Sequence, residues 1–399
     1  MPPVPPAPPP PPAVVEANAS ELASFTRCMA GLRAPAIAAG VNAATFDEHA
    51  ISIVPDMGVL PLLNRQPEFS TPLWDYLAAL VDARRIREGR ERLIKHAELL
   101  DQVAARYGVD PATVVAVWGV ESDYGQNFGR RPLLQSLGTL ACFGRRQPFF
   151  RSELYETLKI VQRGDVAADD LRGSWAGAFG HTQFMPSTYN RIAVDFDGDG
   201  RRDLVGSIPD ALGSTANYLV RSGWQTGQPW GYEIALPAGF NPALAGRTKR
   251  RALADWQALG ITRIDGQPIT LTGQTRAAVL IPTGIDGPAF IVFKNYDAIY
   301  SYNAAESYAL AIALLANALR NEPGLITPWP TDDLGLGRDE RMELQRLLIA
   351  RGHDIGHVDG MLGAKTREAI KLEQTRLGWT ADGRAGTKLL RALGEGSGW

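Results

Sequence analysis

A single glutamate, Glu121, stands near the end of an otherwise apolar run, Val114–Val120. Asp110 and Pro111 open this run as helix N-cap and first helical residue, and Gly125 marks its expected end. A helix this apolar on all faces is usually buried. A carboxyl group buried without a cationic partner has a raised pKa, which suits a general acid. The alternative is a surface glutamate at a helix end, and this segment alone does not decide between the two.

A second segment, Gly173–Tyr189, reads Gly-Ser-Trp-Ala-Gly-Ala-Phe-Gly-His-Thr-Gln-Phe-Met-Pro-Ser-Thr-Tyr. Its glycines let the backbone approach a ligand closely. Its aromatic, amide and hydroxyl side chains are the groups with which proteins stack on sugars and hydrogen-bond to them. The composition favours a sugar-binding site, and a purely structural loop is the alternative.

Together these two segments, in this order and spacing, resemble the lytic murein transglycosylases of the membrane-bound lytic transglycosylase B family. The stretch Phe293–Asn303 (Phe-Lys-Asn-Tyr-Asp-Ala-Ile-Tyr-Ser-Tyr-Asn) also matches, so the resemblance covers about residues 20–320. It implies a mainly helical, lysozyme-like catalytic core with an extra helical region and a small β region. It also implies cleavage of the β-1,4 bond between N-acetylmuramic acid and N-acetylglucosamine in peptidoglycan, leaving a 1,6-anhydromuramoyl end.

Carried over by position, the resemblance makes Glu121 the single catalytic acid and base. It also implies a set of substrate-binding residues, for each of which simple packing is the alternative. They are Ser174, Gln183, Phe184 and Met185 near the cleavage point, Tyr302, Asn303 and Tyr308 across the cleft, Tyr76 upstream, and the pair Arg145 and Arg146, suited to substrate carboxylates.

One carboxylate is enough for this reaction, although ordinary glycosidases use two. The nucleophile would be the substrate's own C6 hydroxyl, whose intramolecular attack has a high effective molarity. Glu121 would protonate the leaving oxygen and then, as the carboxylate, take the proton from that hydroxyl. Asp123 lies two residues further on and points elsewhere on a helix, so we interpret it as structural. No cofactor is required for this chemistry.

A further motif, Asp195-Phe-Asp197-Gly-Asp199-Gly-Arg201, places oxygen ligands as in the first half of an EF-hand loop. Gly206 stands where the usual glutamate would close the loop. Some members of the resembled family close such a loop with a later aspartate, and Asp210 is the matching acid here, although this loop is one residue longer. A structural calcium ion held by Asp195, Asp197, Asp199, the Arg201 carbonyl and Asp210 is one expectation. A polar turn with aspartate caps is the other.

The two cysteines, Cys28 and Cys142, are too far apart in sequence to form a metal-binding motif. They form either one disulfide that closes a long loop or two unrelated buried thiols. Export to an oxidising compartment favours the disulfide.

Composition limits the partners and the compartment. The net charge of −2 argues against binding driven by the phosphates of nucleic acid. No apolar run approaches the roughly 18–20 residues of a membrane span. No signal peptide is visible at the start of the chain, so the periplasmic location that we expect rests on the substrate. Peptidoglycan glycan strands are the expected partners, with other cell-wall enzymes as a further class.

The elements that position these residues divide the 399-residue chain into four parts. Residues 1–19 begin with nine prolines among the first twelve residues, which indicates a disordered tail. Residues 20–325 form the expected catalytic domain, with a β insertion at about 230–295, and 326–333 is a proline-rich linker. Residues 334–393 contain two glycine turns that each lead into a helix, and this part resembles the type 1 peptidoglycan-binding domain, a small three-helix fold.

Within the catalytic domain the sequence predicts helices over 21–40, 73–88, 91–107, 111–124, 151–164 and 304–320, and strands over 277–282 and 289–293. Two other functions stay open on sequence alone. A hydrolytic muramidase would let water attack instead of the C6 hydroxyl. A non-catalytic wall-binding scaffold is disfavoured because the acid and its pocket motif are both present.

Overall fold

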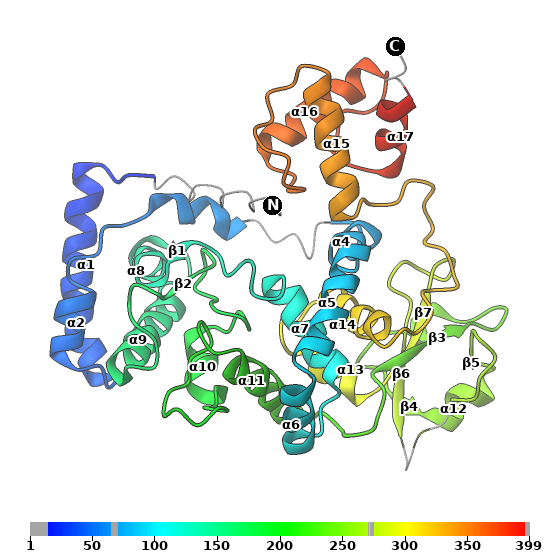
Figure 1. The fold of residues 1–399 in the computed structure, drawn as a ribbon, viewed down its shortest axis with the longest axis horizontal. Coiled ribbons are helices and arrows are strands. Elements are labelled where there is room, and N and C mark those ends of the chain that lie inside the picture. Colours follow the sequence, from blue (N-terminus) through cyan, green and yellow to red (C-terminus); the bar gives the residue numbers. More distant parts are fainter. Residues whose placement is uncertain (1–14, 65–70, 270, 272–274, 396–399) are drawn as a thin grey trace. The chain divides into compact units, whose positions relative to one another are not determined.

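The structure, a computed structural model, describes residues 15–64, 71–269, 271 and 275–395 (Figure 1). The chain forms two compact units. The first combines Met1–Gln66 with Val117–Tyr218, and the second combines Pro67–Ala116 with Leu219–Trp399. The expected mainly helical fold with a small β region is confirmed.

The first unit is built on two helices that pack along each other, α8 (Leu133–Phe143) and α9 (Gln147–Arg163). Helix α1 packs on α8 and helix α2 on α9, so these elements enclose one apolar core. The other elements of this unit are α1 (Ala19–Ala38), α2 (Ala43–His49), η1 (Met57–Asn64), β1 (Arg131–Pro132), β2 (Arg172–Gly173), α10 (Pro186–Ile192) and most of α11 (Ile208–Arg221).

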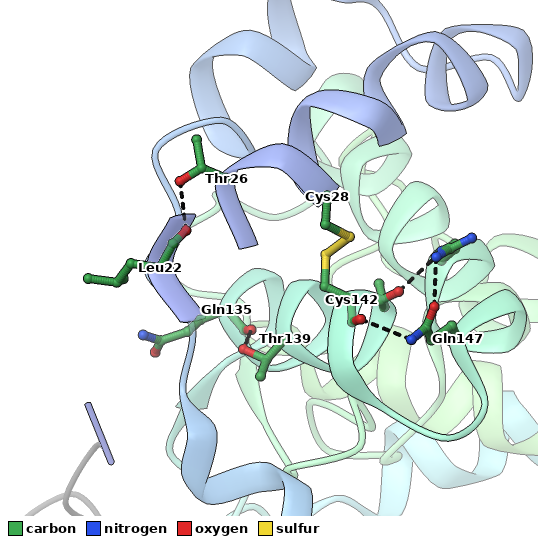
Figure 2. The surroundings of a disulfide bond; sticks show 9 residues. Leu22, Thr26, Cys28, Gln135, Thr139, Cys142 and Gln147 are labelled. Atoms are coloured by element: carbon green, nitrogen blue, oxygen red, sulfur yellow. Dashed lines mark hydrogen bonds between the residues drawn. A yellow bond between two sulfur atoms is a disulfide. The ribbon is translucent and has the colours of Figure 1, made fainter. Parts of the chain in front are cut away.

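A disulfide bond between Cys28 and Cys142 joins α1 to α8 (Figure 2). Its Cα atoms are 5.9 Å apart, although the two residues are separated by 114 positions in the sequence. Of the two possibilities that the sequence left open, the disulfide is therefore the correct one.

Helix α7 (Pro111–Ser122) carries the candidate acid and is buried almost along its whole length, as its apolar sequence predicts. The carboxylate of Asp110 accepts hydrogen bonds from the backbone nitrogen and the hydroxyl of Thr113, which caps the helix start. The helix ends at Ser122, two residues earlier than expected. Asp123 and Tyr124 follow it with φ angles of 52° and 58°, in the left-handed region that non-glycine residues rarely adopt.

The second unit begins with three short helices where the sequence predicted two long ones over 73–88 and 91–107. They are α4 (Leu73–Leu80), α5 (Ala83–Lys95) and α6 (Ala97–Tyr107). The break between α4 and α5 was not predicted. There the Asp82 side chain caps α5 by accepting a hydrogen bond from the Arg85 nitrogen at 2.9 Å. Apolar residues continue across that break, so periodicity alone did not reveal it.

The β region is one antiparallel sheet with strand order β4-β6-β7-β3-β5. Trp256 is fully buried against it and donates a hydrogen bond to the Ala277 carbonyl. The strands are β3 (Gly231–Ala235), β4 (Arg251–Ala252), β5 (Thr262–Arg263), β6 (Arg276–Leu280) and β7 (Ala289–Val292), with η2 (Pro242–Leu244) and α12 (Leu253–Ala258) between them. Two helices follow, α13 (Lys294–Tyr300) and the buried α14 (Glu306–Leu319).

The C-terminal part of this unit has its own apolar core among three helices, α15 (Arg338–Ala350), α16 (Ala364–Arg376) and α17 (Thr387–Glu395). Its internal repeat has a physical basis in two buried glutamines. Gln345 binds the turn at Asp359 with its amide nitrogen and oxygen, and Gln374 binds the matching turn at Asp382 in the same way. Among the described residues, no helix is long and apolar enough to cross a membrane.

Candidate active site

Glu121 lies in the last turn of α7 and is half-buried, whereas the residues that follow it, Ser122 and Asp123, are buried. The helix places one carboxylate at the boundary between the core and the surface of the first unit. The Glu121 side chain is therefore partly shielded from solvent and partly accessible to it.

His181, from the glycine-rich segment, contacts the helix on both sides of Glu121. Trp118 Nε1 donates a hydrogen bond to His181 Nδ1 at 2.9 Å, and Ser122 Oγ donates to the His181 backbone oxygen at 2.8 Å. Burial lowers the pKa of His181 to about 4, although the nearby carboxylate of Asp203 acts in the opposite direction. The imidazole is therefore neutral at physiological pH.

Ser174 and Gln183 sit in one tight structure formed by the glycine-rich segment. The Ser174 hydroxyl accepts a hydrogen bond from the Ala178 nitrogen at 3.0 Å, and the Gln183 amide nitrogen donates to the carbonyls of Phe128 and Gly180. Gln183 has a φ angle of 49°, which turns its side chain within this loop. Among the described residues, no acceptor meets the Ser174 hydroxyl proton and no donor meets the Gln183 amide oxygen.

The two residues after Gln183 have different surroundings. Phe184 is only 2% exposed, and its ring packs against Tyr218 with the centroids 5.6 Å apart. Met185 is half-buried and is the N-cap of α10. Both were predicted to shape the wall of a sugar site, and Phe184 can do so only through packing.

The pair Arg145 and Arg146 is exposed at the start of α9. Arg145 donates a hydrogen bond to the Leu63 carbonyl, and the Arg146 guanidinium lies 4.5 Å from the ring centre of Phe149. Both cations are open to solvent, as residues that bind substrate carboxylates must be.

The remaining predicted substrate residues belong to the second unit. Tyr76 is half-buried on α4, and Asn303 is exposed in the loop before α14. Tyr302 stacks on Tyr308, with ring centroids 6.2 Å apart and planes 23° from parallel. Tyr308 is itself only 3% exposed, so its contribution is to support the ring of Tyr302 by stacking.

Carboxylates gather where the loop after α10 meets the first turn of α11. Ligand oxygens of Asp195, Asp197 and Asp210 lie within 4.8 Å of one another, whereas Asp199 is not part of this cluster. Asp210 is buried, accepts hydrogen bonds from the backbone nitrogens of Phe196 and Asp203, and has a pKa that burial raises. Three acidic groups this close repel one another unless a cation or protons neutralise them, so the donor set fits a calcium ion.

Sequence reasoning missed two residues that support the candidate active site around Glu121. One is His181, described above. The other is Glu153 of α9, which is 3% exposed and accepts hydrogen bonds from the Ser187 nitrogen and hydroxyl at the start of α10. Burial raises the pKa of the Glu153 carboxyl despite these two bonds. The only sequence signal for His181 was its place inside the glycine-rich segment, and Glu153 lies in a helix with no local motif.

Comparison with known proteins identifies two families along the chain. The model of the transglycosylase SLT domain matches residues 24–317, and that of a peptidoglycan binding domain matches residues 337–393. The membrane-bound lytic murein transglycosylase B of Escherichia coli (strain K12) is 33% identical over 241 residues, which are 56% of this chain and 61% of that protein. The match thus spans less than two thirds of that relative's length.

Solved structures agree with these matches over more of the chain. SltB3 from Pseudomonas aeruginosa, in complex with NAG-anhNAM-pentapeptide, is 48% identical with a TM-score of 0.75, covering 92% of this chain and 99% of that one. The same protein in complex with NAG-NAM-pentapeptide matches equally well. The Escherichia coli lytic transglycosylase Slt35, in complex with calcium, is 26% identical with a TM-score of 0.65, covering 77% of this chain and 95% of that one.

Proposed function

The chain belongs to the lytic transglycosylase family of the SLT domain, and from this premise we propose that it cleaves peptidoglycan glycan strands with Glu121 as its single acid and base. The bond broken is the β-1,4 link between N-acetylmuramic acid and N-acetylglucosamine. The observation that carries the proposal is that Glu121 lies at the half-buried end of a buried helix, held beside the turn that contains Gln183.

In the proposed reaction Glu121 gives up one proton and later takes one back. Glu121 donates its proton to the glycosidic oxygen as the bond to the muramic acid C1 breaks. The C6 hydroxyl of the same sugar then bonds to C1, and its proton passes to the Glu121 carboxylate. The products are a free N-acetylglucosamine hydroxyl and a 1,6-anhydro ring, and the acid is regenerated without water or a second carboxylate.

The polar groups left over in the glycine-rich turn suit a sugar ligand. The Ser174 hydroxyl retains a proton to donate, and the Gln183 amide oxygen retains lone pairs to accept a hydrogen bond. A donor and an acceptor on one rigid turn match the acetamido group of an N-acetyl sugar. Arg145 and Arg146 serve the carboxylates of the lactyl group or peptide stem, and Tyr76, Tyr302 and Asn303 remain proposed substrate-binding residues.

The proposal is tested by the products of digested sacculi. Mass spectrometry should find 1,6-anhydromuramoyl ends. Reducing N-acetylmuramic acid ends in their place would identify a hydrolytic muramidase. The absence of any cleavage by the folded wild-type protein would favour a wall-binding scaffold instead.

The identity of the acid is tested by Glu121→Gln, which keeps the side-chain shape but cannot deliver the proton. We expect near-total loss of turnover, at least about a thousandfold, because no second carboxylate takes over. Asp123→Asn is the matched control, since asparagine tolerates the left-handed backbone of that position. If turnover survives in Glu121→Gln but not in Asp123→Asn, then Asp123 rather than Glu121 is the catalytic carboxylate. A pH–rate profile tests the raised pKa predicted for the acid.

We also propose a structural calcium ion between the loop after α10 and the first turn of α11, held by Asp195, Asp197 and Asp210. On the sequence motif alone, Asp199 and the Arg201 carbonyl would complete the set. It would neutralise the clustered carboxylates and takes no part in the proton transfers. Calorimetric titration should show calcium binding that Asp210→Asn abolishes. A melting temperature that neither calcium nor a chelator changes would favour the polar turn, which the bonds from Gly198 and Gly200 to Asp195 also support.

The cellular setting follows from the substrate. Because peptidoglycan lies outside the inner membrane, we place the protein in the periplasm. The Cys28–Cys142 disulfide supports an oxidising compartment. The C-terminal domain would hold the enzyme on the wall, and other cell-wall enzymes are partners that remain to be tested by co-purification.

A further inference from the structure

We propose that His181 is a positioning residue, whose neutral imidazole and backbone carbonyl lock the helix of the acid onto the turn that binds the sugar. This inference rests on the proposed role of Glu121. His181 acts through its neighbours and does not touch the substrate. Its contribution is to fix the distance between the acid and the sugar-binding groups.

The two contacts with the helix bracket the acid. Trp118 lies three residues before Glu121 and donates its indole proton to His181 Nδ1 at 2.9 Å. Ser122 directly follows Glu121 and donates its hydroxyl proton to the His181 backbone oxygen at 2.8 Å. Because Trp118 and Ser122 are four residues apart, they lie one turn from each other, and the turn that carries Glu121 is tied to a single residue.

His181 is equally fixed on the side of the turn. Its backbone nitrogen donates to the Leu204 carbonyl at 2.9 Å. Gln183 follows two residues later, and its amide nitrogen bonds to Phe128 and Gly180. The Phe128 ring stands edge-on to the imidazole, with the centroids 4.7 Å apart. His181 therefore belongs rigidly to the same structure as the sugar-binding groups.

The space around the imidazole is closed as well. His181 is 8% exposed. A Cβ atom on Gly125 would lie 2.4 Å from His181 Cε1, and Gly125 has a φ angle of 85°. Glycine at position 125 is thus required both by the backbone and by the ring that packs on it.

The hydrogen bond from Trp118 to His181 Nδ1 determines which protonation state of the imidazole the positioning role requires. An indole nitrogen only donates, so His181 Nδ1 must be an unprotonated acceptor and the ring proton must lie on Nε2. A protonated imidazole has no acceptor to offer and would face the indole proton with its own. The charged group that bears on the ring is the carboxylate of Asp203. An aliphatic side chain of similar volume would fill the space and lose the bond.

The test compares His181→Leu with His181→Asn in the full chain. The leucine variant keeps the volume and removes the acceptor, whereas asparagine places its oxygen close to the position of Nδ1. On soluble glycan strands we expect His181→Leu to lower kcat by about tenfold to a hundredfold with KM changed less than threefold, because misplacement by about an ångström has this effect. His181→Asn should stay within about threefold of the wild type. The indole proton of Trp118 in NMR spectra, assigned by Trp118→Phe, should shift only when the acceptor is lost.

Trp118→Phe provides a second route, because it removes the donor and keeps His181. In a double-mutant cycle its effect on kcat should overlap with that of His181→Leu rather than multiply with it. Equal kcat per folded molecule in the wild type and in either single variant would overturn the proposal, as would failure of His181→Asn to restore activity. Glu121→Gln is assayed beside them. If that variant stays active, the proposed acid is wrong, whereas an inactive Glu121→Gln with an unaffected His181→Leu rejects only the positioning role.

Discussion

At the scale of single residues, several non-glycine residues around the site have backbone conformations that such residues adopt only when their surroundings enforce them. Asp123 and Tyr124 directly after the helix, and Gln183 in the sugar-binding turn, all have positive φ angles. Each such non-glycine residue costs of order 1 kcal/mol, and these conformations persist only when the surrounding contacts enforce them. Here the enforcing contacts are the packed aromatic rings and the hydrogen bonds of His181.

Gly119 shows how tightly the rings are packed. The Tyr124 ring turns back onto the helix, and a Cβ atom at position 119 would lie 2.6 Å from Tyr124 Cζ. Gly119→Ala should therefore displace the ring and destabilise the protein by about 1–3 kcal/mol, despite the better helix propensity of alanine. Activity should fall further than stability explains, because the displaced ring packs edge-on to Trp118.

Gly31→Ala is the matched control for this change. Gly31 lies inside α1, and a Cβ atom there would meet nothing within 4 Å. That variant should be stabilised by up to about 1 kcal/mol and keep full activity. Urea unfolding and the rate at which soluble products are formed from glycan strands are measured for both variants. Equal effects at the two glycines would contradict the packing argument.

His181 also makes stability depend on pH. Its pKa is about 4 in the folded protein and 6.5 when unperturbed. Because the unfolded chain binds the proton first, the contribution of neutral His181 is fully present above about pH 6.5 and is lost as the pH falls toward 4. Between pH 7 and 4.5 the wild type should lose about 2 kcal/mol more of unfolding free energy than His181→Asn, which has no titrating group there. Parallel curves for the two proteins would show that His181 titrates normally.

At the scale of helices and strands, the sequence predicted those elements whose ends carry their own signals. Helix α7 starts where Asp110 and Pro111 place it, and strands β6 and β7 follow the apolar runs between glycine and proline. The break between α4 and α5 was not predicted. Asp82 caps α5 there, but it lies among residues that continue the helical pattern, and the competing cap is visible only when its bond to Arg85 is seen.

The site was predictable to the extent that its residues lie in motifs. Glu121, Ser174 and Gln183 were selected from the sequence, and the structure holds them within one unit. The hydrogen bond from Trp118 to His181 spans 63 residues and depends on how two motifs are brought together. No local pattern encodes such a contact. The burial of Phe184 and Tyr308 is likewise a property of the packed chain rather than of the motif.

The disulfide between α1 and α8 is an element-scale constraint. The bond closes a loop of 114 residues, and the loop-entropy estimate for that length is about 4–5 kcal/mol of stability. Cys28→Ala/Cys142→Ala should lose roughly that much, and reduction of the wild type should have a similar effect. Unfolding is followed with and without reductant, and the double alanine variant serves as its own control because reductant should not affect it. A wild-type protein whose unfolding is insensitive to reductant would contradict this expectation.

At the scale of the whole molecule, the second unit contains both helix α4 and the C-terminal domain, and one arginine connects them. The Arg384 guanidinium donates two hydrogen bonds to the Asp75 carboxylate, at 2.7 and 2.8 Å, and also bonds to Asp333. Gly335 packs against Asp75, where a Cβ atom would lie 2.6 Å from the Asp75 Cα atom. The domain is therefore held against α4, the helix of Tyr76, rather than only tethered by the linker.

We expect Arg384→Gln to release this contact. Paired, bidentate charges with side chains 25% and 14% exposed contribute more than surface pairs, on the order of 1–3 kcal/mol. The radius of gyration from small-angle X-ray scattering should increase, and a protease should cut the 326–333 linker faster than in the wild type. Lys365→Gln is the control, because the Lys365–Asp354 pair is 65% and 85% exposed and its loss should change neither measurement. If Arg384→Gln behaves like this control, apolar packing rather than the ion pair holds the domain, and binding of sacculi should then be independent of Arg384.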